Sequence, residues 1–223
     1  MRDQNSNLKR GIIKFLTVAG DLMALEALWF VCSLPIITIG PATSALFDIT
    51  LRIANDEPVT VLKGFFMAFK KNFKQALIVG VFSIFVLVTL YADVMYILAI
   101  EGTLQKIYIV VAILVFAMLL IIVTYGNGLL VRYNNTLKGH IINAFKLAFV
   151  NPIQTILMWL VILAPVFMFL FIPPIILVYI GWFIILFAVS LPVYICSNIL
   201  IRIFMRFESQ EVSKKWIEKK QRN

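Results

Sequence analysis

The sequence predicts an all-α protein, a polytopic bundle of about six membrane-spanning helices. Hydrophobic residues make up 62% of its 223 residues, well above the roughly 45–50% of soluble domains. Four apolar runs reach the roughly 18–20 residues that a spanning helix needs. These runs are residues 76–100, 107–131, 153–172 and 175–201. Their length argues against a membrane β-barrel, whose strands are shorter and alternate in polarity.

The N-terminal quarter of the chain adds a helical hairpin over residues 12–54. Residues 12–34 are long enough for one crossing at 1.5 Å per residue. Pro35 disfavours a helix at the residue before it, and Gly40–Pro41 supplies a break and a restart. The returning residues 41–54 span only about 21 Å as a helix, less than the roughly 30 Å hydrocarbon core. We expect the second segment to be short or partly re-entrant.

The Lys and Arg residues lie between the apolar runs, on alternate sides. Their counts are four before residue 15, five in 52–75, one in 101–106, three in 132–152, none in 173–174 and seven after 201. Because basic loops stay in the cytoplasm, this alternation places both termini in the cytoplasm and requires the opening hairpin to turn back. We interpret the net charge of +9 as membrane orientation and expect no nucleic-acid partner.

Two stretches, at 58–75 and from residue 137, are predicted as amphipathic helices on the inner leaflet. In the first, apolar residues recur at helical spacing and lysines mark the polar side. The second is predicted as interfacial because its sequence resembles the first. The alternative for 58–75 is an extension of the next span. The lysines are candidates for contact with anionic lipid or a partner protein. They are Lys63, Lys70, Lys71, Lys74, Lys138 and Lys146.

We expect a single integral membrane domain over residues 1–223. Its parts are the hairpin at 12–54, an interfacial helix plus hairpin at 58–131, a second such unit at 137–204, and a cytoplasmic tail at 205–223. The two units share "LKG", "AFK", Asn and Gln in the same order, which indicates either duplication or coincidence. In the last span, we expect Pro192 to kink the helix.

Acidic residues at membrane depth cost roughly 2.5–3.5 kcal/mol each, so each is a candidate for function. Glu26 lies near the predicted midplane, where it acts either as a proton relay or ligand contact or as a packing hydrogen bond. Its candidate neighbours are Asn127, Asn198 and Tyr194. We expect Asp48 to bond across to the first helix. The full set of ligand or proton-relay candidates is Asp21, Glu26, Asp48, Gly40 and Pro41, with local capping and close packing as the alternative for the glycines and Asp21.

Enzyme signatures are absent from the sequence. It contains no metal-ligand cluster, no CxxC pair, no phosphate-binding loop and no nucleophile motif. We therefore expect no enzymatic activity, no metal and no cofactor. Cys32 and Cys196 both lie in apolar segments and are expected to be packing residues.

Residues 20–46, "GDLMALEALWFVCSLPIITIGPATSAL", resemble the YesL-like family of integral membrane proteins. The resemblance continues in "FFMAFKKNFKQA" at 65–76 and "AFKLAFVNPIQTIL" at 144–157. It implies a multi-pass protein of the cytoplasmic membrane in a Gram-positive bacterium. The family has no known function, and its members are often encoded near carbohydrate ABC transporters, glycoside hydrolases and sensor kinases. The resemblance carries over no catalytic residues.

Three functional hypotheses follow. The first is a non-enzymatic accessory to carbohydrate uptake or sensing, whose partner is a carbohydrate ABC transporter permease or a sensor kinase. The second is a small secondary transporter or permease with a midplane site around Glu26, because transporters bind substrates at broken helices. The third is a lipid-binding membrane scaffold.

Overall fold

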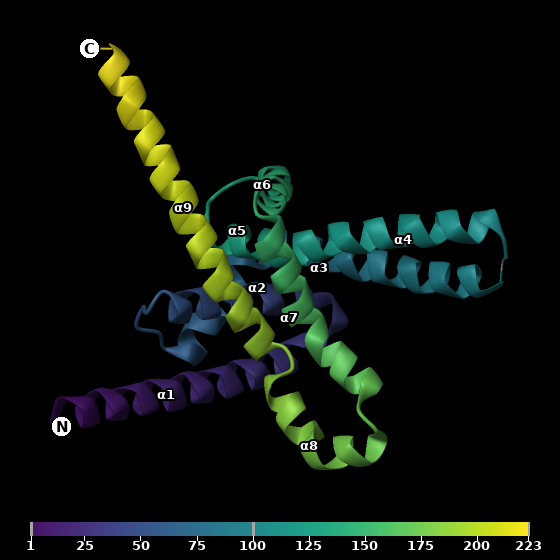
Figure 1. Cartoon of the computed structure of the whole chain (residues 1–223), viewed down its shortest axis with the longest axis horizontal. Helices are drawn as coiled ribbons and strands as arrows, with labels where there is room; N and C mark the ends of the chain where they lie inside the picture. The colour runs from purple at the N-terminus through teal and green to yellow at the C-terminus, as the bar shows by residue number, and fades with distance from the viewer. Residues whose placement is uncertain (1, 100, 223) are drawn as a thin grey trace.

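The computed structural model describes residues 2–99 and 101–222, and it contains helices and no strand within those residues (Figure 1). The helices are α1 Arg2–Ser33, α2 Ile39–Ala54, α3 Val61–Ala99, α4 Thr103–Ile121, α5 Asn127–Arg132, α6 Leu137–Val150, α7 Pro152–Phe171, α8 Pro174–Phe187 and α9 Ser190–Arg222. A 3-10 turn, η1 Ile36–Thr38, precedes α2, and a π-helical turn, η2 Ile122–Gly126, joins α4 to α5.

Within the described residues, six segments are long and apolar enough to cross a membrane. They are Lys9–Ser33, Ile36–Ala54, Val61–Ala99, Thr103–Arg132, Pro152–Phe171 and Ile184–Ser209. Large apolar side chains are exposed along most of them, such as Phe85 on α3 and Phe171 on α7. A soluble protein rarely exposes such surfaces. The predicted all-α, multi-pass bundle is confirmed, and these surfaces contact the lipid bilayer.

α2 is the central helix of the bundle, packed against α1, α3, α5 and α9. Its start follows from the tight turn before it, where Pro35 is extended and the Thr38 hydroxyl donates to the Cys32 carbonyl at 2.7 Å. Pro41 then occupies the first helical turn, where its missing N–H is tolerated. α2 has 16 residues, or about 24 Å. The expectation of a short second segment is confirmed.

Gly40 on α2 and Gly80 on α3 bring the two backbones into direct contact. A Cβ atom at Gly80 would lie 2.5 Å from the Gly40 Cα, closer than real Cβ atoms approach. Gly80 is the middle residue of α3, so the α1–α2 turn meets α3 halfway along its length. This contact is the basis of our prediction that the turn stays within the membrane, as a re-entrant hairpin does. By length and composition alone, Ile36–Ala54 is sufficient to cross.

The predicted interfacial helix at 58–75 is not a separate helix. α3 runs without interruption from Val61 to Ala99, as the alternative of an extended span requires. No proline follows Pro58 within this stretch, so propagating the helix costs less than ending and restarting it. The second predicted stretch is the separate helix α6, which ends because Pro152 disfavours a helix at Asn151. The two proposed repeat units therefore differ in local structure.

The last predicted span, 175–201, is broken into α8 and α9 rather than kinked at Pro192. The interruption lies at Ala188 and Val189. A proline ring clashes with the carbonyl four residues earlier, which here belongs to Ala188, and it cannot donate a backbone hydrogen bond. Pro192 thus lies in the first turn of α9, where this cost disappears. The break leaves backbone N–H groups at the start of α9.

Candidate functional site at the basic end of the bundle

The carboxylate of Glu26 binds the start of α9. It accepts a hydrogen bond of 2.6 Å from the Ser190 amide and bonds of 3.2 Å from the Val189 amide to both of its oxygens. Glu26 is only 8% exposed. The first amides of a helix lack intrahelical partners, and the helix dipole favours a negative charge beside them. Glu26 therefore caps α9 from another helix.

This geometry corrects the partners predicted for Glu26. The Asn127 amide donates instead to the Val123 carbonyl in η2 at 2.9 Å. The Asn198 amide donates to the Tyr194 carbonyl within α9, also at 2.9 Å. None of the cavities described below is lined by Glu26 or Asp21. The arrangement favours the packing interpretation of Glu26 over a transport site. Gly40 is buried in the α2–α3 contact, and Pro41 is fully buried, which favours close packing for both.

Asp48 pairs within its own helix, not with α1 as predicted. Its carboxylate lies 2.8 Å from the Arg52 guanidinium, one turn further along α2. The link to α1 is made instead by Lys14, whose Nζ lies 2.6 Å from the Asp56 carboxylate. Both pairs lie at the end of the bundle that carries Arg52, Lys70, Lys71, Lys74, Arg132 and Lys146, which we call the basic end.

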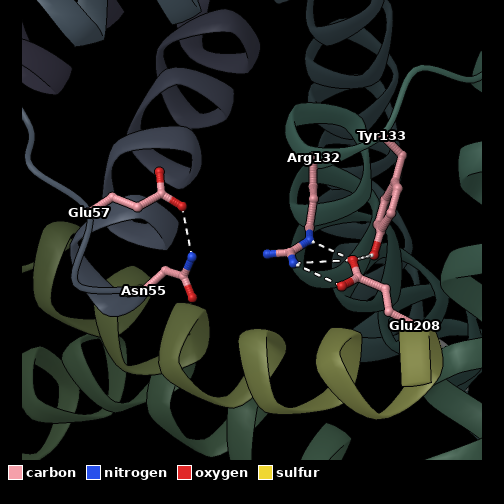
Figure 2. A network of polar contacts seen from close by, with 5 residues as sticks. All are labelled: Asn55, Glu57, Arg132, Tyr133 and Glu208. Atoms are coloured by element: carbon pink, nitrogen blue, oxygen red, sulfur yellow. Dashed lines mark hydrogen bonds and ion pairs between the residues drawn. The ribbon is translucent and has the colours of Figure 1, made fainter. Parts of the chain in front are cut away.

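A polar network ties α5 to α9 at the basic end (Figure 2). The Arg132 guanidinium donates to Glu208 at 3.1 and 3.2 Å, and the Tyr133 hydroxyl donates to Glu208 at 2.7 Å. Burial, followed by the bond to Glu208, raises the pKa of Tyr133 to about 12, so its hydroxyl stays a donor. Asn55 and Glu57 face Arg132 across a small polar cavity of about 250 Å³.

Two larger cavities flank the loop at residues 133–136. The lysine cavity, of about 910 Å³, lies between this loop and α3. It is lined by Lys70, Lys71, Asn72, Lys74, Gln75, Leu130 and the loop residues. The α6 cavity, of about 520 Å³, lies on the other side of the loop. Its lining includes His140, Asn143, Lys146, Phe204, Phe207 and Glu208.

The loop between the two cavities is held by hydrogen bonds. The Thr136 hydroxyl accepts from the Gly139 amide at 3.2 Å and so caps α6. The Asn135 side chain accepts from the Thr136 amide at 2.8 Å, and Gln75 on α3 donates to the Asn135 carbonyl at 3.3 Å. The loop is therefore fixed to both α3 and α6, and the cavities have defined walls.

His140 is buried in the wall of the α6 cavity. Burial is the main influence on its pKa, which it lowers below the usual value of 6.5, against a smaller opposite effect from the Asn135 backbone. At neutral pH the imidazole is therefore uncharged. Lys146 and Glu208 are the charged groups in this lining.

The structure gathers some of the predicted lysines and separates others. Lys70, Lys71 and Lys74 meet in one cavity and Lys146 lies in the next, whereas Lys63 and Lys138 line neither. Sequence reasoning missed Arg132, Tyr133, Glu208 and the loop at 134–136. The signal for the loop was the polar run "RYNNT" between two apolar segments. In the part of the chain that the structure describes, no cluster of His, Cys, Asp or Glu is arranged to hold a metal ion.

Comparison with known proteins gave one match, to a protein family, over part of the chain. A family model described as "Protein of unknown function, DUF624" matches residues 22–94. The match is to an uncharacterised family. It covers less than half of the chain and includes Glu26, the Gly40–Gly80 contact and the lysines of α3. No curated protein and no solved structure gave a match.

Proposed function

We propose that this multi-pass membrane protein is a non-enzymatic accessory to carbohydrate uptake or sensing. It belongs, in this proposal, to the YesL-like family and lies in the cytoplasmic membrane of a Gram-positive bacterium. Its partner is a carbohydrate ABC transporter permease or a sensor kinase. The motifs at 20–46, 65–76 and 144–157 support the family context, and the α6 cavity is the observation that supports partner binding.

The α6 cavity suits a segment of polypeptide. Its volume of about 520 Å³ lies within the range of roughly 300–1,000 Å³ that is typical of binding pockets. The rings of Phe204 and Phe207 supply an apolar surface, and Lys146 and Glu208 supply one charge of each sign. Aromatic anchors surrounded by polar groups are typical of protein interfaces. A partner loop with an apolar side chain between charged residues matches this lining.

Two lysines on α6 provide a matched test. Lys146 lines the cavity, whereas Lys138 lies on the same helix outside it, and both are exposed. The tagged protein is purified from its native membrane in mild detergent, and co-purifying proteins are identified. We expect a stoichiometric permease or sensor kinase with the wild type and with K138E, and its loss with K146E. A wild-type protein that purifies without such a partner contradicts the proposal, as does equal capture by K146E.

A further inference from the structure

We propose that the lysine cavity binds the headgroup phosphate of an anionic phospholipid, with an acyl chain lying along α3. This site is separate from the α6 cavity and concerns a lipid rather than a protein partner. The lining carries Lys70, Lys71 and Lys74 and no carboxylate. Such a concentration of positive charge at a membrane interface attracts anionic lipid.

The charge of the cavity lysines is compensated only in part, because the Asp48 carboxylate acts on Lys71 from beyond ion-pair distance. Lys14, Arg52 and Arg132 each pair with a carboxylate, whereas the ion pairs among the described residues include none of the cavity lysines. The Asn72 amide nitrogen is also buried without a hydrogen-bond partner in the described part of the chain. Buried polar groups are normally paired, so the wall of the cavity at Asn72 retains an unused hydrogen-bond donor.

An apolar groove continues the cavity along α3. It has a volume of about 450 Å³ and is lined by Leu77, Ile78, Val81, Phe82 and Phe85. Its first residue follows Gln75, the last cavity residue on α3, by two positions. A phosphate bound in the cavity would thus lie directly beside the apolar groove.

The cavity and the groove share one face of the helix. Lys70, Lys74, Ile78, Val81 and Phe85 follow one another at spacings of four, four, three and four residues, which places them on a single stripe. From Lys74 to Phe85 the stripe runs about 16 Å, close to half of the roughly 30 Å hydrocarbon core. This is the depth that the acyl chains of one leaflet occupy. The geometry favours a lipid over a free phosphate compound.

The test compares lipids retained by the full-length protein in native mass spectrometry from detergent. Phosphatidylglycerol, phosphatidylcholine and soluble glycerol phosphate are each supplied. We expect retention of phosphatidylglycerol alone. Replacing all three lysines with Gln lowers retention by at least about tenfold, since each lysine near an anionic surface is worth roughly a factor of five. Equal retention of phosphatidylcholine, or equally tight binding of glycerol phosphate, overturns the proposal.

Matched single variants keep the test informative if the triple variant does not fold. K71Q removes a cavity lysine, and K63Q removes an exposed lysine of the same helix outside the cavity. We expect K71Q to weaken phosphatidylglycerol retention and K63Q to leave it unchanged. V81W fills the groove with an apolar side chain and is expected to weaken retention while the lysines remain. Equal effects of K71Q and K63Q contradict the assignment.

Discussion

The Glu26 carboxylate and the Ser190 amide are joined by a hydrogen bond of 2.6 Å across 164 residues of sequence. The amide is available because of a helix break, and the carboxylate requires donors because of its depth. Pro192 forces the break at Ala188 and Val189, and the break leaves the first amides of α9 without intrahelical partners. A carboxylate at membrane depth in turn needs donors. The contact therefore fixes α1 against α9.

Replacing Glu26 is expected to destabilise the bundle. E26A leaves buried amides unpaired and should lower the free energy of unfolding by about 3 kcal/mol, whereas E26Q keeps a neutral acceptor and should cost about 1 kcal/mol. Unfolding in detergent can be followed with a thiol-reactive dye, because the Cys196 thiol is fully buried. The measurement uses a C32S background, since Cys32 is partly exposed.

D21N is the matched control for Glu26. It removes a carboxylate from the same helix at a partly exposed position that lines none of the three basic-end cavities. We expect a change below about 0.5 kcal/mol, as for other surface substitutions. Equal losses for D21N and E26Q would mean that the cap on α9 does not stabilise the fold.

The Gly40–Gly80 contact predicts that alanine substitutions at different glycines have unequal effects on stability. G40A and G80A place a methyl group against the backbone of the facing helix, and we expect a loss of roughly 3 kcal/mol or more. G20A makes the same substitution on α1, where no atom lies within 4 Å of the new methyl group. G20A should leave stability unchanged or raise it by up to about 1 kcal/mol. Thermal unfolding of the three variants side by side checks this.

His140 predicts a pH dependence of stability. Burial lowers its pKa in the folded protein below 6.5, so the unfolded chain binds the proton more readily. The stabilisation by neutral His140 is fully present above the unfolded pKa and is lost as the pH falls through and below it. We expect the unfolding temperature to fall between about pH 7.5 and about pH 5.5. H140Q should show a smaller fall, and an identical fall would show that His140 is not the titrating group.

The hydrogen bond from Tyr133 to Glu208 is expected to stabilise the contact between α5 and α9. Y133F removes the hydroxyl that donates to Glu208 at 2.7 Å while keeping the ring against Phe204. We expect a loss of about 1 kcal/mol, because Arg132 continues to bind the carboxylate. A double-mutant cycle with E208Q isolates the bond. A coupling energy near zero would mean that water replaces the hydroxyl at no cost.

The sequence predicted the features that depend on composition and local breaks. Apolar length predicted four of the membrane segments, and the alternation of basic loops required the opening hairpin. Pro35 with Gly40 predicted the short second helix. The burial of Glu26 also followed from its depth. Its partner did not, because the start of a helix inside the apolar run 175–201 carries no side-chain signal of its own. The effect of Pro192 falls at Ala188, four residues earlier.

The basic-end cavities could be predicted only in part. The lysines of α3 were evident as candidates, but the loop at 133–136 lies about 60 residues away in the sequence from its hydrogen-bonding partner Gln75. The spacing of residues along one helix cannot reveal that a loop distant in the sequence forms the other wall of the cavity. The continuous α3 was the alternative rather than the first prediction for a related reason, since amphipathic spacing at 58–75 is compatible with both a surface helix and an extension of the next span.

Cysteine accessibility from the two sides of the membrane is the most direct test of the predicted topology. In that topology the basic end faces the cytoplasm and the α1–α2 turn remains within the bilayer. Single cysteines at Asn134, Thr103 and Ile37, in a background without Cys32 and Cys196, are treated with a membrane-impermeant thiol reagent. We predict labelling of N134C only from the cytoplasmic side, of T103C only from outside, and of I37C from neither. Labelling of I37C from outside would contradict the account.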